Sequence, residues 1–141
     1  MSLRLEIVTP EAQVYSQEVD GVIAPTAEGD INVLPGHIPL ISILEAGELE
    51  VQQNGSTGTT ALAVDRGYLQ VAGDKVSILT EAAIDVEDID LDEAHQARER
   101  AAANLEKAKN DQEMDPEEME RLEAQFRFAM AREISKGKRK N

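Results

Sequence analysis

The sequence predicts a β-then-α fold: an antiparallel β-sandwich, or flattened barrel, over residues 1–85, and an antiparallel helical hairpin over residues 86–141. Two observations predict it. The first part contains short stretches rich in Val, Ile, Leu and Thr, separated by Gly-rich turns, which is typical of packed sheets. Charge density then changes, from 3 basic and 13 acidic side chains in the first part to 11 and 15 in the second, a composition typical of exposed helices.

Strands in the first part are predicted from alternating polarity. Residues 3–7 alternate apolar and charged side chains and should end before Pro10, and residues 20–24 should end at Pro25. Further strands are expected at 40–44, 48–52, 60–64, 68–71 and 75–79. Asn54-Gly55 is a typical turn sequence. Many short strands with such turns predict two packed antiparallel sheets.

Residues 28–40 are the most unusual stretch of the chain. Gly29 and Gly36 allow positive φ, and Pro35 and Pro39 fix φ. We predict two rigid turns that flank a short strand and lie close together, a typical place for partner contacts. Their tips would present the side chains of Glu28, Asp30 and His37. The alternative for His37 is a structural turn residue whose ring satisfies a nearby carbonyl.

The second part predicts two helices joined to the first part by an acidic linker, residues 85–90. A helix over about 91–109 follows from the lack of Gly and Pro and from Asp90 as its cap, and a second helix over about 116–135 begins at Asp115-Pro116. The first has a face of small residues (Ala94, Ala97, Ala101, Leu105, Ala108) and the second has larger ones (Met119, Leu122, Phe126, Ala129, Met130). Such faces favour a tight hairpin that needs the sandwich or a partner to hold its position.

Composition excludes several functional classes for this chain of 141 residues. It has no Cys and no Trp, and its net charge of −14 repels nucleic acid and anionic lipid. It lacks an apolar run of the roughly 20 residues needed to span a bilayer, and its first residues lack the apolar centre of a signal peptide. We therefore expect a cytoplasmic protein without direct membrane insertion.

Catalytic and metal-binding chemistry are both disfavoured. The acidic residues near the linker lack the ligand order and central Gly of an EF-hand, so we interpret them as a solvated helix start rather than a metal site. They are Asp85, Glu87, Asp88, Asp90 and Asp92. An enzyme of the small β-sandwich or cupin kind would need clustered His residues or a nucleophile with a base, but His37 and His95 lie in different segments. The chain is therefore predicted to be non-catalytic.

Five motifs carry a family resemblance that covers nearly the whole chain. The most specific is Leu-Pro-Gly-His-Ile-Pro-Leu at 34–40, which follows Glu-Gly-Asp-Ile at 28–31. Gly-Tyr-Leu-Gln-Val at 67–71, Val-Ser-Ile-Leu at 76–79 and Asp-Leu-Asp-Glu-Ala at 90–94 agree with it. With the order of sandwich and hairpin, these motifs resemble the epsilon subunit of bacterial F-type ATP synthases.

The resemblance implies a rotor subunit in the central stalk, which couples proton-driven rotation to ATP synthesis at the cytoplasmic face of the cell inner membrane. The sandwich would dock on the gamma subunit and on the c-ring. The implied c-ring contacts are Glu28, Gly29, Asp30, Ile31 and His37. These residues would act as a stiff wedge and would need no chemistry of their own.

The resemblance also implies a mobile hairpin that extends into the alpha/beta catalytic head and inhibits ATP hydrolysis. Such mobility needs two packings that differ by only a few kcal/mol. Arg127, Arg132 and Lys136 would then meet an acidic segment of the beta subunit. The alternative is that these cations are plain surface residues, and charge alone does not decide between the two interpretations.

Some members of this family bind ATP through an Ile/Leu-Asp-X-X-Arg-Ala motif. The matching residues here include Ile89, Asp90 and Ala94, but Glu93 replaces the arginine. An anion in place of a cation should weaken nucleotide binding, so we expect no cofactor. The alternative overall function is a non-catalytic β-sandwich adaptor unrelated to ATP synthase.

Overall fold

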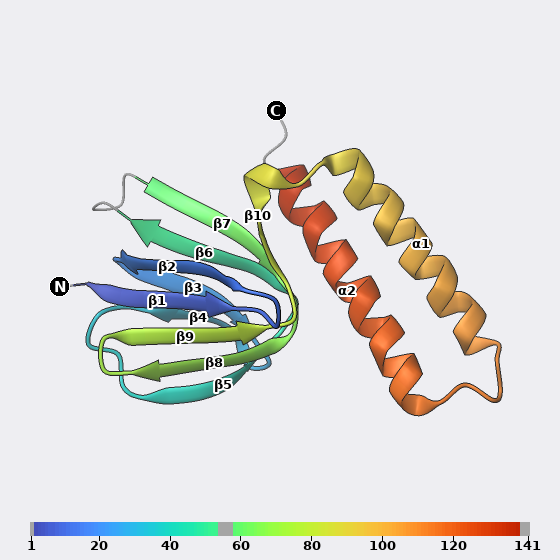
Figure 1. The fold of residues 1–141 in the computed structure, drawn as a ribbon, viewed down its shortest axis with the longest axis horizontal. Coiled ribbons are helices and arrows are strands. Elements are labelled where there is room, and N and C mark those ends of the chain that lie inside the picture. Colours follow the sequence, from blue (N-terminus) through green and yellow to red (C-terminus); the bar gives the residue numbers. More distant parts are fainter. Residues whose placement is uncertain (1, 54–57, 139–141) are drawn as a thin grey trace.

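The computed structural model describes residues 2–53 and 58–138. Within these ranges, ten strands form a flattened β-structure and two long helices lie at one end of it (Figure 1). The strands are β1 (Leu3–Val8), β2 (Gln13–Val19), β3 (Gly21–Thr26), β4 (Gly29–Val33), β5 (Leu40–Leu44), β6 (Gly47–Gln53), β7 (Gly58–Val64), β8 (Gly67–Ala72), β9 (Lys75–Thr80) and β10 (Ala83–Asp85). The 3₁₀ turn η1 (Val86–Asp88) leads to α1 (Leu91–Lys109) and α2 (Pro116–Lys138). The predicted Asn54-Gly55 turn lies outside the described residues.

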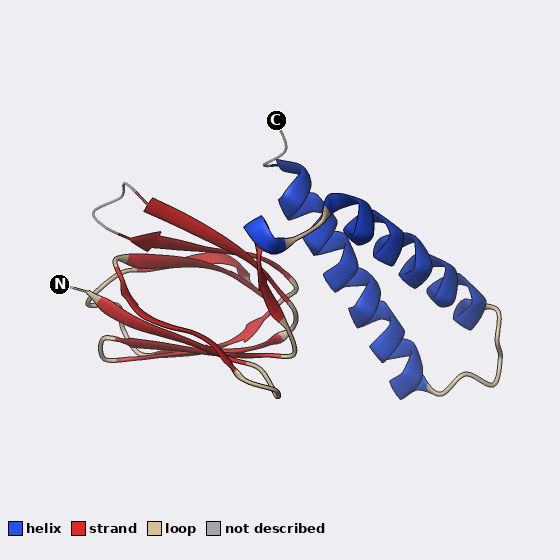
Figure 2. Ribbon diagram, turned by 45° about the horizontal axis from the view of Figure 1, so that its top comes forward, coloured by secondary structure: helices blue, strands red, loops and turns tan. Residues whose placement is uncertain are grey.

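The strands form a nearly closed barrel. Their hydrogen-bonded order is β10-β7-β6-β3-β5-β8-β9-β1-β2, with β4 paired to β3. The side chain of Gln53 links the end of β6 to β2, the last strand in this order. Its Nε2 donates to the Tyr15 hydroxyl at 2.5 Å and to Gln17 Oε1 at 3.0 Å. Figure 2 shows the flattened, barrel-like cross-section that results. The predicted fold class, a sandwich or flattened barrel followed by two packed helices, is confirmed.

The inward-facing residues of the strands form one apolar core. Alternate residues of β1 (Leu3, Leu5, Ile7) are fully buried, as the alternation predicts. Leu69 and Ile78, which face each other across β8 and β9, are buried in the same cluster. Burying such side chains contributes roughly 1.5–3 kcal/mol each relative to leaving them exposed. This core fixes the strand register and therefore decides which side chains face outward.

Three features of the sheet differ from the prediction. β1 pairs with β9 in parallel, with Leu5 opposite Val76, so the sheet is not wholly antiparallel. β2 and the short β10 were not predicted, since β2 has polar residues on both faces and buries only Val19 completely.

The third difference is at Pro25, where β3 does not end. The Pro25 carbonyl accepts from Glu45 N at 2.9 Å. The nitrogen and oxygen of one residue point to the same side of a strand. On that side, β3 pairs with β6 only as far as Ile23 and with β5 only at Thr26. Pro25 lies between these two pairings. The missing N–H of Pro25 therefore costs no ladder bond, and β3 continues to Thr26.

The two helices form the expected antiparallel hairpin. α1 covers the residues that the sequence predicts, and α2 continues to Lys138, three residues further than expected. Asp90 caps α1, because its Oδ1 accepts from Asp92 N at 2.9 Å and from Glu93 N at 3.3 Å. The expected apolar stripe of α2 is wrong in one place: Met130 is exposed, whereas Ala124 and Ala129 are buried.

A second, small apolar cluster joins the hairpin to the sandwich. Val86 and Ile89 in the linker are buried together with Ala61 and Ala63 of β7 and Ala94 of α1, and the partly buried Phe128 of α2 packs against them. The linker is therefore anchored by two apolar side chains, although its other residues are acidic. Three of the five buried residues are alanines, which keeps the buried contact modest.

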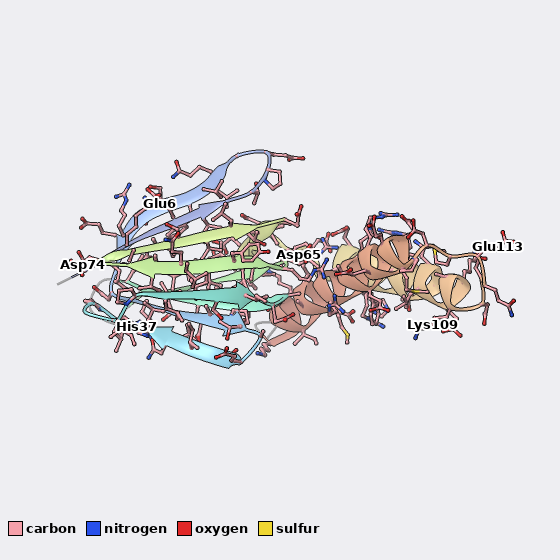
Figure 3. The ribbon with its side chains drawn as sticks, turned by 90° about the horizontal axis from the view of Figure 1, so that it is seen from below. Glu6, His37, Asp65, Asp74, Lys109 and Glu113 are labelled. Atoms are coloured by element: carbon pink, nitrogen blue, oxygen red, sulfur yellow. The ribbon has the colours of Figure 1, made fainter. Side chains whose placement is uncertain are left out.

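The strands alternate in direction along the chain, so the turns divide between the two ends of the barrel. Glu28 lies in the β3–β4 turn at the end near the hairpin, and His37 lies in the β4–β5 loop at the opposite end. Figure 3 shows His37 and Asp74 at the end far from the helices and Asp65 beside them. The predicted proximity of the two turns is therefore wrong, because the extended strand β4 separates them.

Candidate interaction surfaces

The first candidate surface is the outer edge of β4 with the turn before it. Among the described residues β4 pairs only with β3, and Glu28, Gly29 and Asp30 are exposed. Gly29 has φ of 108°, a conformation that other residues adopt only with strain. Thr26 fixes this turn, because its hydroxyl donates to Gly29 O at 2.5 Å and accepts from Glu28 N at 3.2 Å. Sequence reasoning missed this role of Thr26.

The β4–β5 loop continues this edge at the other end of the barrel. His37 N donates to Leu34 O at 3.1 Å, and the His37 ring Nδ1 lies 2.7 Å from Ile38 O, which agrees with a structural role for the ring. Leu34 and Ile38 are exposed. Ile31 differs from the other predicted contact residues, because it packs against the main core.

The second candidate surface is an apolar row that crosses four neighbouring strands. Ile43, Tyr68, Leu79 and Val8 are direct partners across β5, β8, β9 and β1. Their side chains are between 37% and 62% exposed, and Ile41 beside them is 72% exposed. A soluble surface rarely exposes such a contiguous apolar patch unless it contacts a partner. We call these five residues the apolar row.

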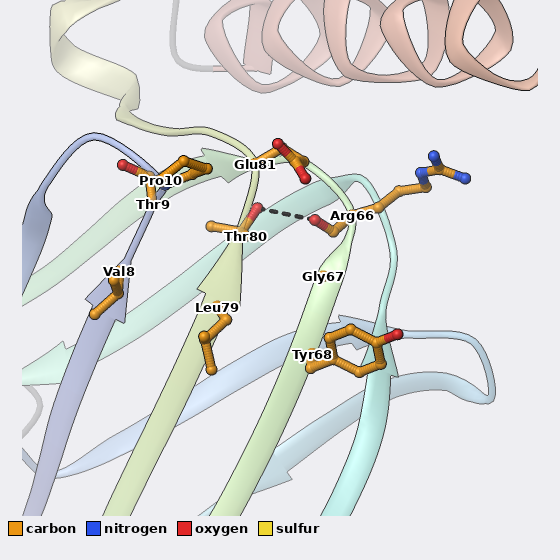
Figure 4. Close-up of a pocket in the computed structure, with 9 residues that line it drawn as sticks. All are labelled: Val8, Thr9, Pro10, Arg66, Gly67, Tyr68, Leu79, Thr80 and Glu81. Carbon is orange, nitrogen blue, oxygen red and sulfur yellow. Dashed lines mark hydrogen bonds between the residues drawn. The ribbon is translucent and has the colours of Figure 1, made fainter. Parts of the chain in front are cut away.

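A shallow cavity of about 420 Å³ lies at the hairpin end of the apolar row. Figure 4 shows Val8, Tyr68 and Leu79 beside the Thr9-Pro10 turn and the Thr80-Glu81 turn. Thr80 supports the rim, since its hydroxyl contacts Asp65 O at 2.7 Å and Arg66 O at 3.2 Å. Sequence reasoning missed this surface, because it becomes continuous only when the strand register is known.

Each residue of the degenerate nucleotide motif has a structural role here. Ile89 and Ala94 are buried in the small cluster between linker and hairpin. Asp90 caps α1. Glu93 Oε2 lies 3.6 Å from Arg132 NH1 on α2. The carboxylate that stands where the motif has arginine therefore lies close to the guanidinium of Arg132.

Arg132 also lines a cavity of about 270 Å³ between α1 and α2, together with Arg100 of α1 and with Asp65 from the barrel. The guanidinium of Arg132 lies 5.3 Å from the centroid of the Phe128 ring, and its Nε is buried without a hydrogen-bond partner. Burial is the main cause that raises the pKa of Asp65 above its ordinary value. The cavity therefore holds charges of both signs close together.

The three predicted beta-subunit contacts lie along α2. Besides Arg132, they are Arg127, whose NH1 lies 3.9 Å from Glu123 Oε2, and Lys136, whose Nζ donates to Glu87 O at 3.5 Å. Two of the three therefore hold α2 in this arrangement, Arg132 to α1 and Lys136 to the linker. These two become available to a partner only if α2 leaves this position.

Comparison with known proteins identifies the family. The family model described as ATP synthase, Delta/Epsilon chain, beta-sandwich domain matches residues 2–86. The ATP synthase epsilon chain of Nitratidesulfovibrio vulgaris is 46% identical over 104 residues, which are 74% of this chain and 76% of that protein. The chain belongs to the ATP synthase epsilon family. The ATP synthase epsilon chain 2 of Syntrophotalea carbinolica is 41% identical over 132 residues, 92% of this chain and 90% of that one.

A solved structure agrees with the fold of this epsilon chain. A chain of the mitochondrial ATP synthase of Euglena gracilis superposes with a TM-score of 0.74 at 24% identity, over 95% of this chain and 81% of that one. The relatives make this epsilon chain a non-catalytic central-stalk subunit and exclude the alternative of an unrelated adaptor. No helix in the described ranges is long and apolar enough to cross a bilayer.

Proposed function

We propose that this epsilon chain acts as a coupling element of the rotor and as a mobile inhibitor of ATP hydrolysis. The observation that carries the proposal is the division of the molecule into a rigid barrel with two outward-facing surfaces and a hairpin with a modest attachment. The barrel would be held peripherally at the cytoplasmic face of the inner membrane by the gamma subunit and the c-ring. The hairpin would reach the alpha/beta head.

The apolar row is the proposed docking surface for gamma. It is an outer face of the sheet, and its residues are held by ladder pairing, so the surface is formed before the partner arrives. Preformed apolar contacts lose little conformational entropy on binding. The adjoining cavity could receive one side chain of gamma.

The proposed c-ring contact runs along the β4 edge. Glu28, Gly29 and Asp30 lie at one end of β4 and His37 follows its other end, so a partner could touch all of them only if the barrel lies on its side. The hydrogen bonds of Thr26 fix the turn at Gly29, and Pro35 and Pro39 fix φ in the loop, so this edge is stiff. Ile31 would support the contact from the core rather than make it.

This geometry makes a crosslinking prediction, because the chain has no cysteine of its own. We expect both Asp30→Cys and His37→Cys variants to crosslink to cysteine-bearing c-subunit loops in the assembled complex. Gln13→Cys, an exposed position on β2, is the control and should not crosslink. Crosslinking from only one of the two positions would show that one end of the barrel contacts the c-ring. It would contradict the proposed contact along the β4 edge.

The hairpin is the proposed inhibitory element. Between barrel and α2, the ion pair of Arg66 NH1 with Glu120 Oε1 at 3.1 Å is exposed, and exposed pairs contribute only roughly 0–1 kcal/mol. In the small cluster between them, partly buried Phe128 of α2 packs with Ala61 and Ala63 of β7. Such contacts favour an arrangement that a competing site can replace. Extension would break the contact of Lys136 with Glu87 O in the linker, and movement of α2 away from α1 would free Arg132 from Glu93. Both could then contact the beta subunit, together with Arg127.

We propose that ATP is not a tight ligand of this chain. Glu93→Arg would remove an anion and add a cation beside Arg132, so we expect it to raise ATP affinity about tenfold, or about 1.4 kcal/mol. Isothermal titration calorimetry measures this directly. Glu99→Arg is the matched control, because Glu99 contacts His95 instead of Arg132. Equal affinities of the Glu93→Arg variant and the unchanged chain would contradict the role given to Glu93.

A further inference from the structure

His95 lies between two carboxylates that come from different helices. Its Nδ1 is 3.0 Å from Glu133 Oε1 on α2, and its Nε2 is 3.1 Å from Glu99 Oε1, one turn further along α1. A neutral imidazole has a single N–H, so it can donate to only one of them. The protonated ring donates to both. The geometry therefore fits the charged form of His95.

The surrounding charges belong to the same two helices. Arg98 of α1 binds the second oxygen of Glu133. The charged groups that act on His95 are Glu133 of α2 and Glu99 and Arg98 of α1. A separate contact between the two helices joins Glu93 of α1 to Arg132 of α2 at 3.6 Å. His95 is thus the group in this network that can change its charge under mild conditions.

We propose that His95 is a proton-dependent clamp that holds α1 against α2 when it is protonated and loosens their contact when it loses its proton. The ligand of the clamp is the proton itself. The link to regulation rests on the proposed function of the hairpin, whereas the clamp is a property of this chain alone.

The pKa shifts set the sign of the pH dependence. The hydrogen bond from His95 to Glu133, followed by the charge of Glu99, raises the pKa of His95 above its ordinary 6.5. The clamp is therefore complete below that ordinary value and is lost as pH rises through the higher pKa of the folded chain. The pKa of Glu133 is lowered, first by its bond to His95, so its contribution is lost only as pH falls below its ordinary 4.5.

The clamp therefore acts in weakly acidic and neutral solution and weakens in alkaline solution. If the extended hairpin inhibits hydrolysis as proposed, a rise in pH would favour the inhibitory arrangement. The half-exposed position of His95 lets it exchange protons with solvent without a conformational change.

The separation of the helices tests the clamp in the isolated full chain. Spin labels on Gln96→Cys and Gly137→Cys report the distance between α1 and α2, and a side chain at Gly137 meets no atom within 4 Å. We expect a narrow distance distribution at about pH 6 and a longer, broader one at about pH 9. With His95→Gln added, the distribution should be the same at both pH values, and with His95→Arg it should stay narrow.

A second measurement follows the proton directly. In NMR titrations, Glu133→Gln should lower the titration midpoint of His95, and Glu118→Gln should leave it unchanged, because Glu118 pairs with Arg121 on its own helix. An unchanged midpoint in Glu133→Gln, or an equal pH response of the helix distance with and without His95, would overturn the clamp. Neither result depends on the assembled enzyme, so failure of the clamp would leave the proposed inhibitory role to be tested separately.

Discussion

Replacing Tyr68 by glutamate is expected to abolish stable binding of this chain to the gamma subunit. Tyr68 lies at the centre of the apolar row, with Ile43 and Leu79 as its direct strand partners. A carboxylate there would lose water on docking without gaining a partner, and central interface residues commonly contribute at least about 2 kcal/mol. We expect affinity to fall about 100-fold, or about 2.7 kcal/mol, in a co-purification or surface-binding assay with gamma.

The control for this prediction makes the same chemical change on another surface. Ile134 of α2 is also an exposed apolar residue, at 53% exposure, but it lies on the hairpin. Ile134→Glu should bind gamma as the unchanged chain does. Because Tyr68 is 62% exposed, the Tyr68→Glu variant should fold normally, which circular dichroism can verify. Normal gamma binding by a folded Tyr68→Glu variant would remove the apolar row as the docking surface.

Removal of the hairpin is expected to raise ATP hydrolysis by the assembled enzyme several-fold while assembly remains intact. Truncation after Asp90 keeps Val86 and Ile89, which cover Ala61 and Ala63, so the barrel retains most of the small cluster. Without α1 and α2, no element could extend into the catalytic head. Hydrolysis assays on the complex, together with proton-driven synthesis, measure both consequences.

A milder variant distinguishes release of inhibition from general damage. Glu120→Ala removes the exposed ion pair with Arg66 and leaves the hairpin present. It should favour extension and therefore lower hydrolysis slightly, the opposite direction from truncation. A rise in hydrolysis in both variants, or loss of coupled synthesis after truncation, would contradict the division of labour between barrel and hairpin.

The elements with a clear local sequence pattern could be predicted. α1 follows from an uninterrupted helical stretch and from the cap at Asp90, and β1 follows from strict alternation of its residues. β2 could not be predicted, because its sequence has little apolar periodicity and its place depends on pairing with β1 and on Gln53. The sequence also could not show whether β3 ends at Pro25, since this depends on whether a neighbouring strand faces the nitrogen of Pro25.

The candidate surfaces show the same limit. Residues 28–40 are recognisable from their glycines and prolines, but the distance between their two turns depends on the direction of β4. The apolar row was missed, because it combines single residues from four strands that are distant in sequence. The His95 clamp was missed as well: Glu133 lies 38 residues away and meets His95 only once the helices pair. Helix spacing alone predicts only the contact with Glu99.

The parallel pairing of β1 with β9 has a consequence for biosynthesis. Leu5 and Val76, which face each other, are separated by about 70 residues, so the first strand leaves the ribosome long before its neighbour is made. Until then β1 can pair only with β2, and its other edge has no partner strand. The barrel can close only after nearly all of its strands have been synthesised. The two helices follow the strands in the chain and therefore pack onto a barrel that is already complete.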